Sequence, residues 1–121
     1  MSELSYVVQA AGDRLHVNVR GDFNPDALFR MVDEIESRCS EAGLSRAFVD
    51  FREVGPPKSE FHRFAVGSYV AQRMQYRVRV AILWRKEYVT GLLENSALNR
   101  GGLLRVFETE AEADAWLAGH D

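Results

Sequence analysis

Two short, almost wholly apolar runs constrain the fold of this chain more than any other feature. Residues 47–51 read AFVDF, in which only Asp50 interrupts the apolar side chains, and residues 78–84 read VRVAILW. Such runs are typical of strands that are covered on both faces, whereas a strand with one wet face alternates apolar and polar residues. The sequence therefore predicts that these runs form two central strands of a sheet.

A corner and a helix separate the two runs. Gly55, Pro56 and Pro57 end regular structure, because proline has no backbone N–H to donate and restricts the residue before it. After them, Ser59 is a good N-cap, and Glu60 suits the first turn of a helix. The apolar residues that follow recur at roughly helical spacing and predict the buried face of that helix: Phe61, Phe64, Ala65, Tyr69, Val70 and Met74.

The rest of the chain repeats this alternation of strands and helices. Its predicted elements are hairpin strands over 6–11 and 14–21, helices over 25–43, 88–99 and 109–119, and a last strand over 103–107. Strands that alternate with helices of this length imply right-handed crossovers and a largely parallel sheet. The prediction is one α/β domain over residues 1–121, in the order β-β-α-β-α-β-α-β-α, with a mostly parallel five-stranded sheet.

The composition limits the classes of function. The chain carries 15 basic and 18 acidic side chains, a net charge of −3, and so lacks the basic excess typical of nucleic-acid-binding proteins. The single cysteine, Cys39, falls on the apolar side of its predicted helix, which favours a small core residue in a reducing compartment. The purest apolar run, residues 80–84, is far shorter than the ~20 residues of a membrane-spanning helix. We therefore expect a cytoplasmic protein without a membrane span and without a nucleic-acid partner.

Four segments of the chain carry a resemblance to a known family. They are the strand that ends in AFVDFREV, the helix after it, the strand VRVAILW and the closing run ENSALNRGGLLRVFETEAEADAWL. Together they resemble the STAS-like family, which includes anti-sigma-factor antagonists and the cytoplasmic domains of sulfate transporters, and especially its SpoIIAA-like branch of stand-alone bacterial proteins. The resemblance implies strands in consecutive order, a layout similar to lipid-binding domains of the CRAL-TRIO type, and a regulatory role.

The corner GPPKSEF holds the residue that this resemblance singles out. Anti-sigma-factor antagonists of the family place a phosphorylatable serine in a D-S-x-G turn at the start of the helix after the third strand. Ser59 lies in roughly the matching place and is a candidate phosphoacceptor, although Lys58 precedes it instead of aspartate and Phe61 replaces the glycine. A phosphate there would be favoured by the helix dipole and by unpaired N–H groups. The alternative is an ordinary helix-capping serine.

No catalytic motif is present in the sequence. G-x-S-x-G, a P-loop, G-x-G-x-x-G, H-E-x-x-H and C-x-x-C are all missing. Asp50 is explained by a structural role in which it accepts hydrogen bonds at the strand end, and His62 lacks a nucleophile or base partner. Arg100 could bind an anion, or it could lie at a helix C-terminus, where positive charge is favourable. We predict a protein that is not an enzyme and that has no cofactor and no metal site.

Two functions remain open on this basis. We expect a non-enzymatic regulatory or protein-interaction module whose partner contacts the corner after the third strand, and the candidate binding residues are Lys58, Ser59, Phe61, His62 and Arg100. The alternative is a binding protein for a small apolar or lipid-like ligand, in which aromatic side chains near the corner would line a pocket rather than belong to the core: Phe61, Phe64, Tyr69, Trp84 and Tyr88. A symmetric homodimer is also expected, because helices mostly on one side of the sheet leave its other face to be covered.

Overall fold

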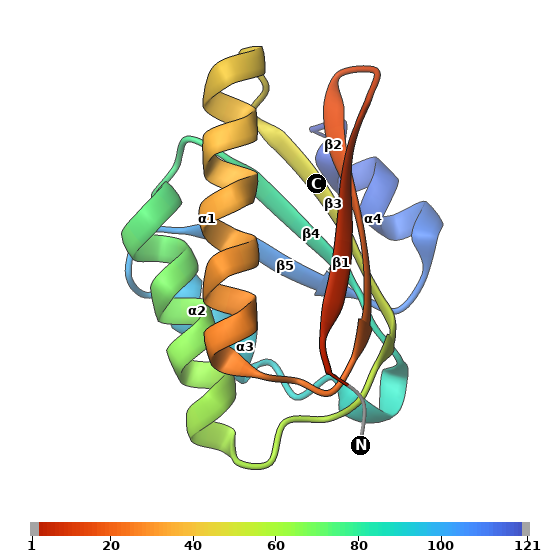
Figure 1. The fold of residues 1–121 in the computed structure, drawn as a ribbon, viewed down its shortest axis with the longest axis vertical. Helices are drawn as coiled ribbons and strands as arrows, with labels where there is room; N and C mark the ends of the chain where they lie inside the picture. Colours follow the sequence, from red (N-terminus) through yellow and green to blue (C-terminus); the bar gives the residue numbers. More distant parts are fainter. Residues whose placement is uncertain (1–2, 120–121) are drawn as a thin grey trace.

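The fold is a five-stranded sheet between two layers of helices (Figure 1). The computed structural model describes residues 3–119. The strands lie in the order β1-β2-β3-β4-β5, with β1 antiparallel to β2 and every other neighbouring pair parallel. Their bounds are Ser5–Ala11 (β1), Arg14–Gly21 (β2), Arg46–Val54 (β3), Arg79–Leu83 (β4) and Leu103–Phe107 (β5). The predicted α/β class and consecutive strand order are confirmed.

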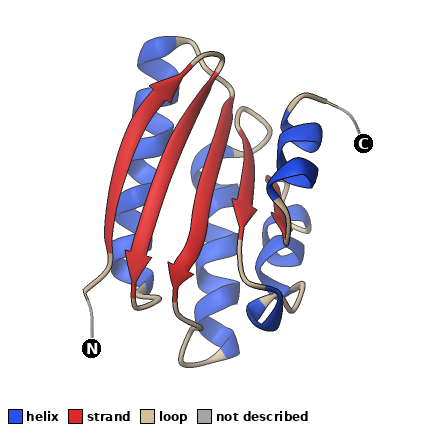
Figure 2. Ribbon diagram, turned by 90° about the vertical axis from the view of Figure 1, so that its right-hand side faces the viewer, coloured by secondary structure: helices blue, strands red, loops and turns tan. Residues whose placement is uncertain are grey.

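The helices divide unequally between the two faces of the sheet. Three of them cover one face, and the C-terminal helix lies on the other, as Figure 2 shows from the side. The helices are α1 (Pro25–Ala42), α2 (Glu60–Met74), α3 (Leu92–Leu98) and α4 (Glu110–Leu117), with a short 3-10 helix, η1, at Lys86–Tyr88. The helix that the sequence predicted over 88–99 is therefore shorter and is preceded by η1.

Local sequence signals set the ends of several helices. The Asn24 side chain accepts a hydrogen bond from the backbone N–H of Ala27 at 3.1 Å, which caps α1 at its N-terminus. Gly43 ends α1 in the left-handed conformation, with a φ of 67° that few other residues adopt without strain. Thr109 and Glu112, in the sequence pattern T-x-x-E, cap α4, because Thr109 Oγ1 accepts from the backbone N–H of Glu112 at 3.3 Å.

The sheet separates a large core from a small one. On the side of α1 to α3, the large core includes Val17, Val49 and Ile82 from the strands. On the side of α4, the small core joins Phe48 of β3 to Trp116 of α4. The two apolar runs thus lie at the centre of the sheet and are buried on both faces, as predicted.

This arrangement corrects the reason for expecting a dimer. The sequence suggested that the sheet face opposite the main helices needs a partner, but α4 covers that face over β3 and β4. Over β1 and β2 the same face carries polar side chains such as His16 and Asn18, which water can solvate. Neither part of this face therefore requires a second copy.

At each free edge of the sheet, one backbone group is hydrogen-bonded to a side chain from a helix. At the β1 edge, Arg38 Nη2 donates to the carbonyl oxygen of Val8 at 2.8 Å. At the β5 edge, Glu94 Oε2 accepts from the backbone N–H of Val106 at 2.9 Å. Because an open edge invites pairing with another strand, these two bonds disfavour extension of the sheet.

The face of α2 that is buried differs from the predicted one. Val70 and Met74 point inward as expected, but Phe61 is 69% exposed, and the prediction is wrong for it. The buried residues of α2 are Arg63, Val66, Gly67, Val70, Ala71 and Met74. Gly67 fixes this rotation, because a Cβ at that position would lie 2.3 Å from the carbonyl oxygen of Leu93 in α3. The helix can approach α3 closely only with this glycine facing it.

We predict that Phe48→Ala will lower the free energy of unfolding by roughly 3–5 kcal/mol. Phe48 is only 2% exposed and fills the small core against α4, so the substitution removes buried apolar surface and leaves a cavity. The matched control is Phe61→Ala, the same change at a mostly exposed position, which should cost less than about 1 kcal/mol. Urea unfolding followed by circular dichroism measures both values, and equal losses would contradict the two-core description.

Candidate functional site

The corner formed by residues 54–61 is anchored to the core at its first residues. The indole Nε1 of Trp84 donates to the carbonyl oxygen of Val54 at 3.0 Å, and the backbone N–H of Gly55 donates to the carbonyl oxygen of Gly21 at 3.1 Å. Pro56 and Pro57 then restrict the backbone of the segment that follows. The corner is thus a stiff loop at the carboxyl ends of β2 and β3, where parallel sheets commonly bind ligands and partners.

Ser59 occupies the N-cap position of α2, as predicted, but does not cap it through its side chain. Its backbone is extended, with φ −151° and ψ 158°, and its hydroxyl makes no hydrogen bond to the first turn of α2. Its carbonyl oxygen accepts from the backbone N–H of His62 at 3.1 Å. The Ser59 hydroxyl is therefore exposed at the positive end of a 15-residue helix.

Two hollows meet at the start of α2, and His62 lines both. The first, of about 480 Å³, is lined by Glu3, Leu4, Asp22, Phe23, Asn24, Pro25, Asp26, Lys58 and His62. The second, of about 330 Å³, is lined by Pro25, Asp26, Phe29, Phe61, His62 and Ala65. We call the two hollows together the corner groove. It runs between the N-terminus of α1 and the N-terminus of α2.

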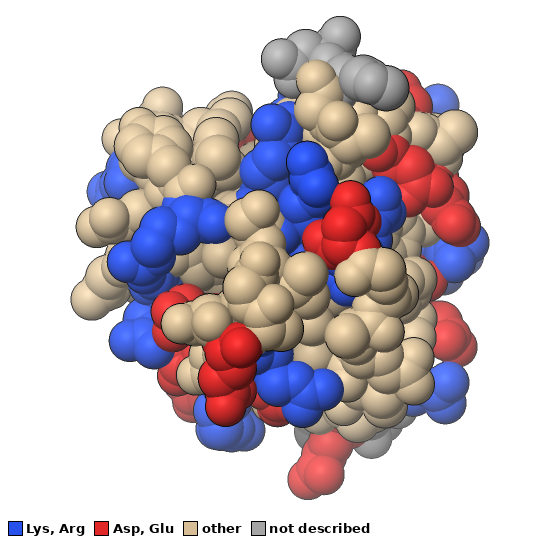
Figure 3. Space-filling view, turned by 90° about the horizontal axis from the view of Figure 1, so that it is seen from above, with Lys and Arg blue, Asp and Glu red and all other residues tan. Residues whose placement is uncertain are grey.

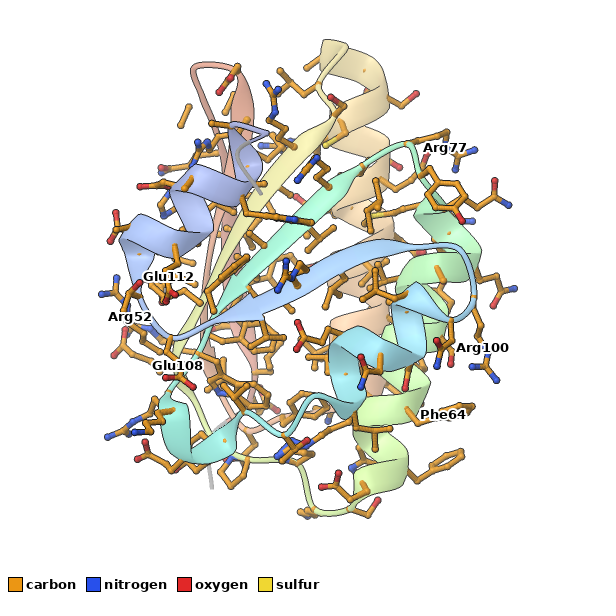
Figure 4. The ribbon with its side chains drawn as sticks, turned by 180° about the vertical axis from the view of Figure 1, so that it is seen from behind. Arg52, Phe64, Arg77, Arg100, Glu108 and Glu112 are labelled. Atoms are coloured by element: carbon orange, nitrogen blue, oxygen red, sulfur yellow. The ribbon has the colours of Figure 1, made fainter. Side chains whose placement is uncertain are left out.

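Two phenylalanine rings and an arginine continue this surface along α2. The Phe61 ring lies 6.1 Å from that of Phe64, measured between centroids. The guanidinium of Arg100 lies 4.6 Å from the centre of the Phe64 ring, and Figure 4 shows these two side chains next to each other. Arg100 has no ion pair within residues 3–119, so its N–H donors face solvent beside an aromatic ring.

The structure thus brings the predicted binding residues to one side of the molecule. Lys58 and His62 line the first hollow, Phe61 and His62 line the second, and Arg100 reaches the same surface through Phe64. The sequence interpretation missed the acidic residues on the other wall of the groove, which are Glu3, Asp22 and Asp26. A signal for them was present in the sequence. The Asn24-Pro25 helix start follows the second strand, and the corner follows the third, so in a parallel pair both segments lie at the same edge of the sheet.

A buried cation lies beneath the corner. Arg63 is only 5% exposed, its guanidinium lies 5.3 Å from the centre of the Trp84 ring, and its Nε donates to Glu60 Oε1 at 3.3 Å. Arg63 Nη1 and His62 Nδ1 are both buried, and neither has a hydrogen-bond partner in the described part of the chain. A buried polar atom without a partner costs roughly 1–3 kcal/mol. Two such atoms lie in the first turn of α2, next to the corner.

Two other residues considered in the sequence have structural roles. Asp50 accepts from the Arg52 side chain through both carboxylate oxygens, at 3.0 and 2.7 Å, and from the Arg52 backbone N–H at 3.0 Å. Burial raises the pKa of the Asp50 carboxyl, but the hydrogen bonds and charge of Arg52 outweigh it and leave the pKa below its usual value. Cys39 is buried in the large core, where burial raises the pKa of its thiol to about 11.

Residues 3–119 contain no cluster of three or more histidine, cysteine, aspartate or glutamate side chains that could hold a metal ion. In the same range, no helix combines the length and the apolar character needed to cross a membrane.

Comparison with solved structures supports the predicted fold. An anti-sigma factor antagonist from Mycobacterium paratuberculosis aligns with a TM-score of 0.67 and 11% identity, over 96% of this chain and 95% of that one. An uncharacterized protein with a SpoIIAA-like fold from Shewanella loihica aligns with a TM-score of 0.60 and 19% identity, over 97% and 95%. The anti-sigma factor antagonist SpoIIAA in its unphosphorylated form aligns with a TM-score of 0.58 and 13% identity, over 95% and 99%. No protein-family model and no curated protein sequence matches the chain. The fold is thus SpoIIAA-like, in agreement with the resemblance found in the sequence.

We expect the two N-cap side chains to contribute differently to stability. Asn24→Ala removes an observed capping hydrogen bond and should lower the free energy of unfolding by about 0.5–2 kcal/mol. Ser59→Ala removes no such bond and should cost less than about 0.5 kcal/mol. Chemical denaturation of the two variants and the wild type makes the comparison, and a loss for Ser59→Ala as large as that for Asn24→Ala would contradict the observed geometry.

The Asp50–Arg52 pair should make stability depend on pH. Because the Asp50 pKa is lower in the folded state than in the unfolded chain, the pair stabilises the fold above the unfolded value of about 4. This contribution is lost as the pH falls from there through the folded-state pKa. Asp50→Asn should therefore have a lower free energy of unfolding than the wild type at neutral pH. This gap between the two free energies should narrow below pH about 4. Urea melts across this range test it, and a gap that stays constant with pH would refute the assignment.

Proposed function

We propose that the chain is a non-enzymatic regulatory module of the STAS-like type that binds a protein partner through the corner groove. The observation that carries this proposal is the exposure of Phe61 in the first turn of α2, directly after an anchored loop. The exposed apolar surface of a phenylalanine that is 69% exposed is unfavourable in water, so a partner that covers it gains free energy, and Phe61 lines the second hollow. Two proteins that share the fold are described as anti-sigma factor antagonists, which supports a regulatory function that acts on another protein.

The shape and chemistry of the groove favour a protein partner over a small molecule. Its walls combine an apolar ring at Phe61 with charged groups at Asp26 and Lys58, the mixture of apolar centre and polar rim found at protein interfaces. The anchored corner is stiff, so it loses little conformational entropy when a partner binds. A surface of this kind can contact several side chains of a partner at once.

The alternative of an apolar or lipid-like ligand loses its main support. It required Trp84 to line a pocket, but this side chain is 2% exposed and packs against Phe23 and Phe51 at ring-centroid distances of 5.8 and 5.4 Å. Tyr88 packs against Trp84 at 5.8 Å. These rings belong to the core, so the aromatic residues near the corner do not form one common cavity.

Phosphorylation of Ser59 is part of the proposal. The hydroxyl is exposed, makes no capping bond and stands at the N-terminus of α2, where a phosphate would meet unpaired N–H groups and a favourable dipole. Lys58 is adjacent and exposed, and within residues 3–119 it has no ion pair. A phosphate of about −2 charge beside Phe61 would change both the charge and the solvation of the contact surface.

The proposal predicts that the corner groove determines which proteins the chain binds. The tagged chain, cross-linked in the cells that produce it, should recover a set of proteins that Phe61→Ser loses by about tenfold or more, because the substitution removes the apolar centre of the contact. The matched control is Val7→Ser, which removes a 56% exposed apolar side chain from the opposite face of the sheet and should keep the set.

Variants at Ser59 test the regulatory part. Ser59→Glu, which carries one negative charge, should change recovery of the same proteins, whereas Ser59→Ala should keep it. All variants are compared at equal foldedness, judged by thermal melting. If Phe61→Ser, Lys58→Glu and Ser59→Glu all recover the wild-type set, the contact surface lies elsewhere.

A further inference from the structure

The surface around Phe61 has opposite charges on its two sides. On the α1 side, which we call the acidic half, lie the carboxylates of Glu3, Asp22 and Asp26, with Lys58 among them. None of these three carboxylates has an ion pair or hydrogen bond with another residue of the range 3–119. On the α3 side, which we call the basic half, Arg100 lies over Phe64 and likewise has no carboxylate partner within that range.

Several charged side chains at the other end of the molecule are paired within the chain. Figure 3 views the end opposite the corner, where arginine and acidic side chains are interspersed. Two ion pairs lie there, Arg14 to Asp114 at 2.7 Å and Arg46 to Asp13 at 2.9 Å. At the corner end, by contrast, charges without an ion pair in the range 3–119 lie on both sides of an exposed phenylalanine.

We propose that two copies of this chain associate through this surface, about a twofold axis close to Phe61. In a twofold contact the same patch serves both partners, so each half of the patch meets the other half on the second copy. The acidic half of one copy would then face Arg100 of its partner, twice per dimer. Phe61 would pack against Phe61 of the second copy at the centre.

The rest of the surface leaves fewer routes to self-association. The two sheet edges carry the bonds from Arg38 and Glu94, and α4 covers part of the second sheet face. The uncovered part of that face holds the Asp50–Arg52 pair, whose charges already satisfy each other. A self-complementary charge pattern around an apolar centre is found instead at the corner end.

This contact deepens the proposed function, because it rests on the same surface. If a second copy covers Phe61, a regulatory partner can bind only after the dimer has separated. Self-association would then compete with partner binding. The fraction of chains with an uncovered corner groove would fall as the protein concentration rises. A phosphate on Ser59 would add negative charge near the centre of the contact and disfavour the dimer as well.

Sedimentation velocity of the purified full chain tests the proposal. The wild type should show a monomer–dimer equilibrium over a concentration series that reaches about 1 mM, because a contact centred on one exposed ring is small and small contacts bind weakly. Phe61→Ser should abolish the dimer, whereas Val7→Ser should leave the dissociation constant unchanged. Thermal melts confirm that the variants fold.

Charge reversal gives a stricter test. Arg100→Glu and Asp26→Arg should each raise the dissociation constant by about tenfold, because each places like charges opposite one another. The double variant restores opposite charges across the interface and should return the constant to near the wild-type value. The matched control is Arg105→Glu, since Arg105 is also exposed and lies 5.6 Å from the centre of an aromatic ring, that of Phe107 in β5.

The outcomes separate this inference from the proposed function. A wild type that remains monomeric at all concentrations overturns the dimer, and so does a dimer that persists in Phe61→Ser or a double variant no better than the single ones. If the wild type forms no dimer while Phe61→Ser still loses cellular partners, the inference is wrong and the proposed function is supported. If the dimer behaves as expected but no cellular protein depends on the corner, the inference stands and the proposed partner binding fails.

Discussion

Burial of β3 on both faces is the constraint on which the rest of the structure depends. Val49 and Phe51 point into the large core under α1 and α2, while Phe48, which directly precedes Val49 in sequence, points into the small core under α4. A strand of this kind cannot lie at an edge, so it requires a neighbour and a helical layer on each side. The parallel pairing with β2 and β4, and the docking of α4, follow from that requirement.

Trp84 connects this core to the corner groove. Its ring packs between core phenylalanines and under the guanidinium of Arg63, while its indole N–H holds the carbonyl oxygen of Val54. The first residue of the corner is thus bonded to one of the most buried side chains in the protein. Phe61 stands exposed in the first turn of α2, directly after this fixed segment, and an exposed ring held by a fixed backbone is suited to recognition.

The α2 helix illustrates the limit of periodicity arguments. The helical spacing predicted a buried face that joins Phe61 to Val70 and Met74. The structure buries Val70 and Met74 but leaves Phe61 exposed, because close packing against α3 requires Gly67 at the interface. A hydrophobic pattern reports which residues can be buried, but close contact between two helices selects among them.

The sequence by itself determined the elements and their order, because the signals for them are local. The two apolar runs, the asparagine and threonine caps of α1 and α4, and the proline corner each act within a few residues, and the resemblance added the consecutive strand order. Tertiary structure decided which distant residues meet. Asp26 and His62 line one groove only because β2 and β3 are parallel neighbours and end at the same edge, and Arg100 joins them only through the packing of α3 against α2. Such contacts depend on the three-dimensional arrangement of whole elements, and no local pattern in the sequence specifies them.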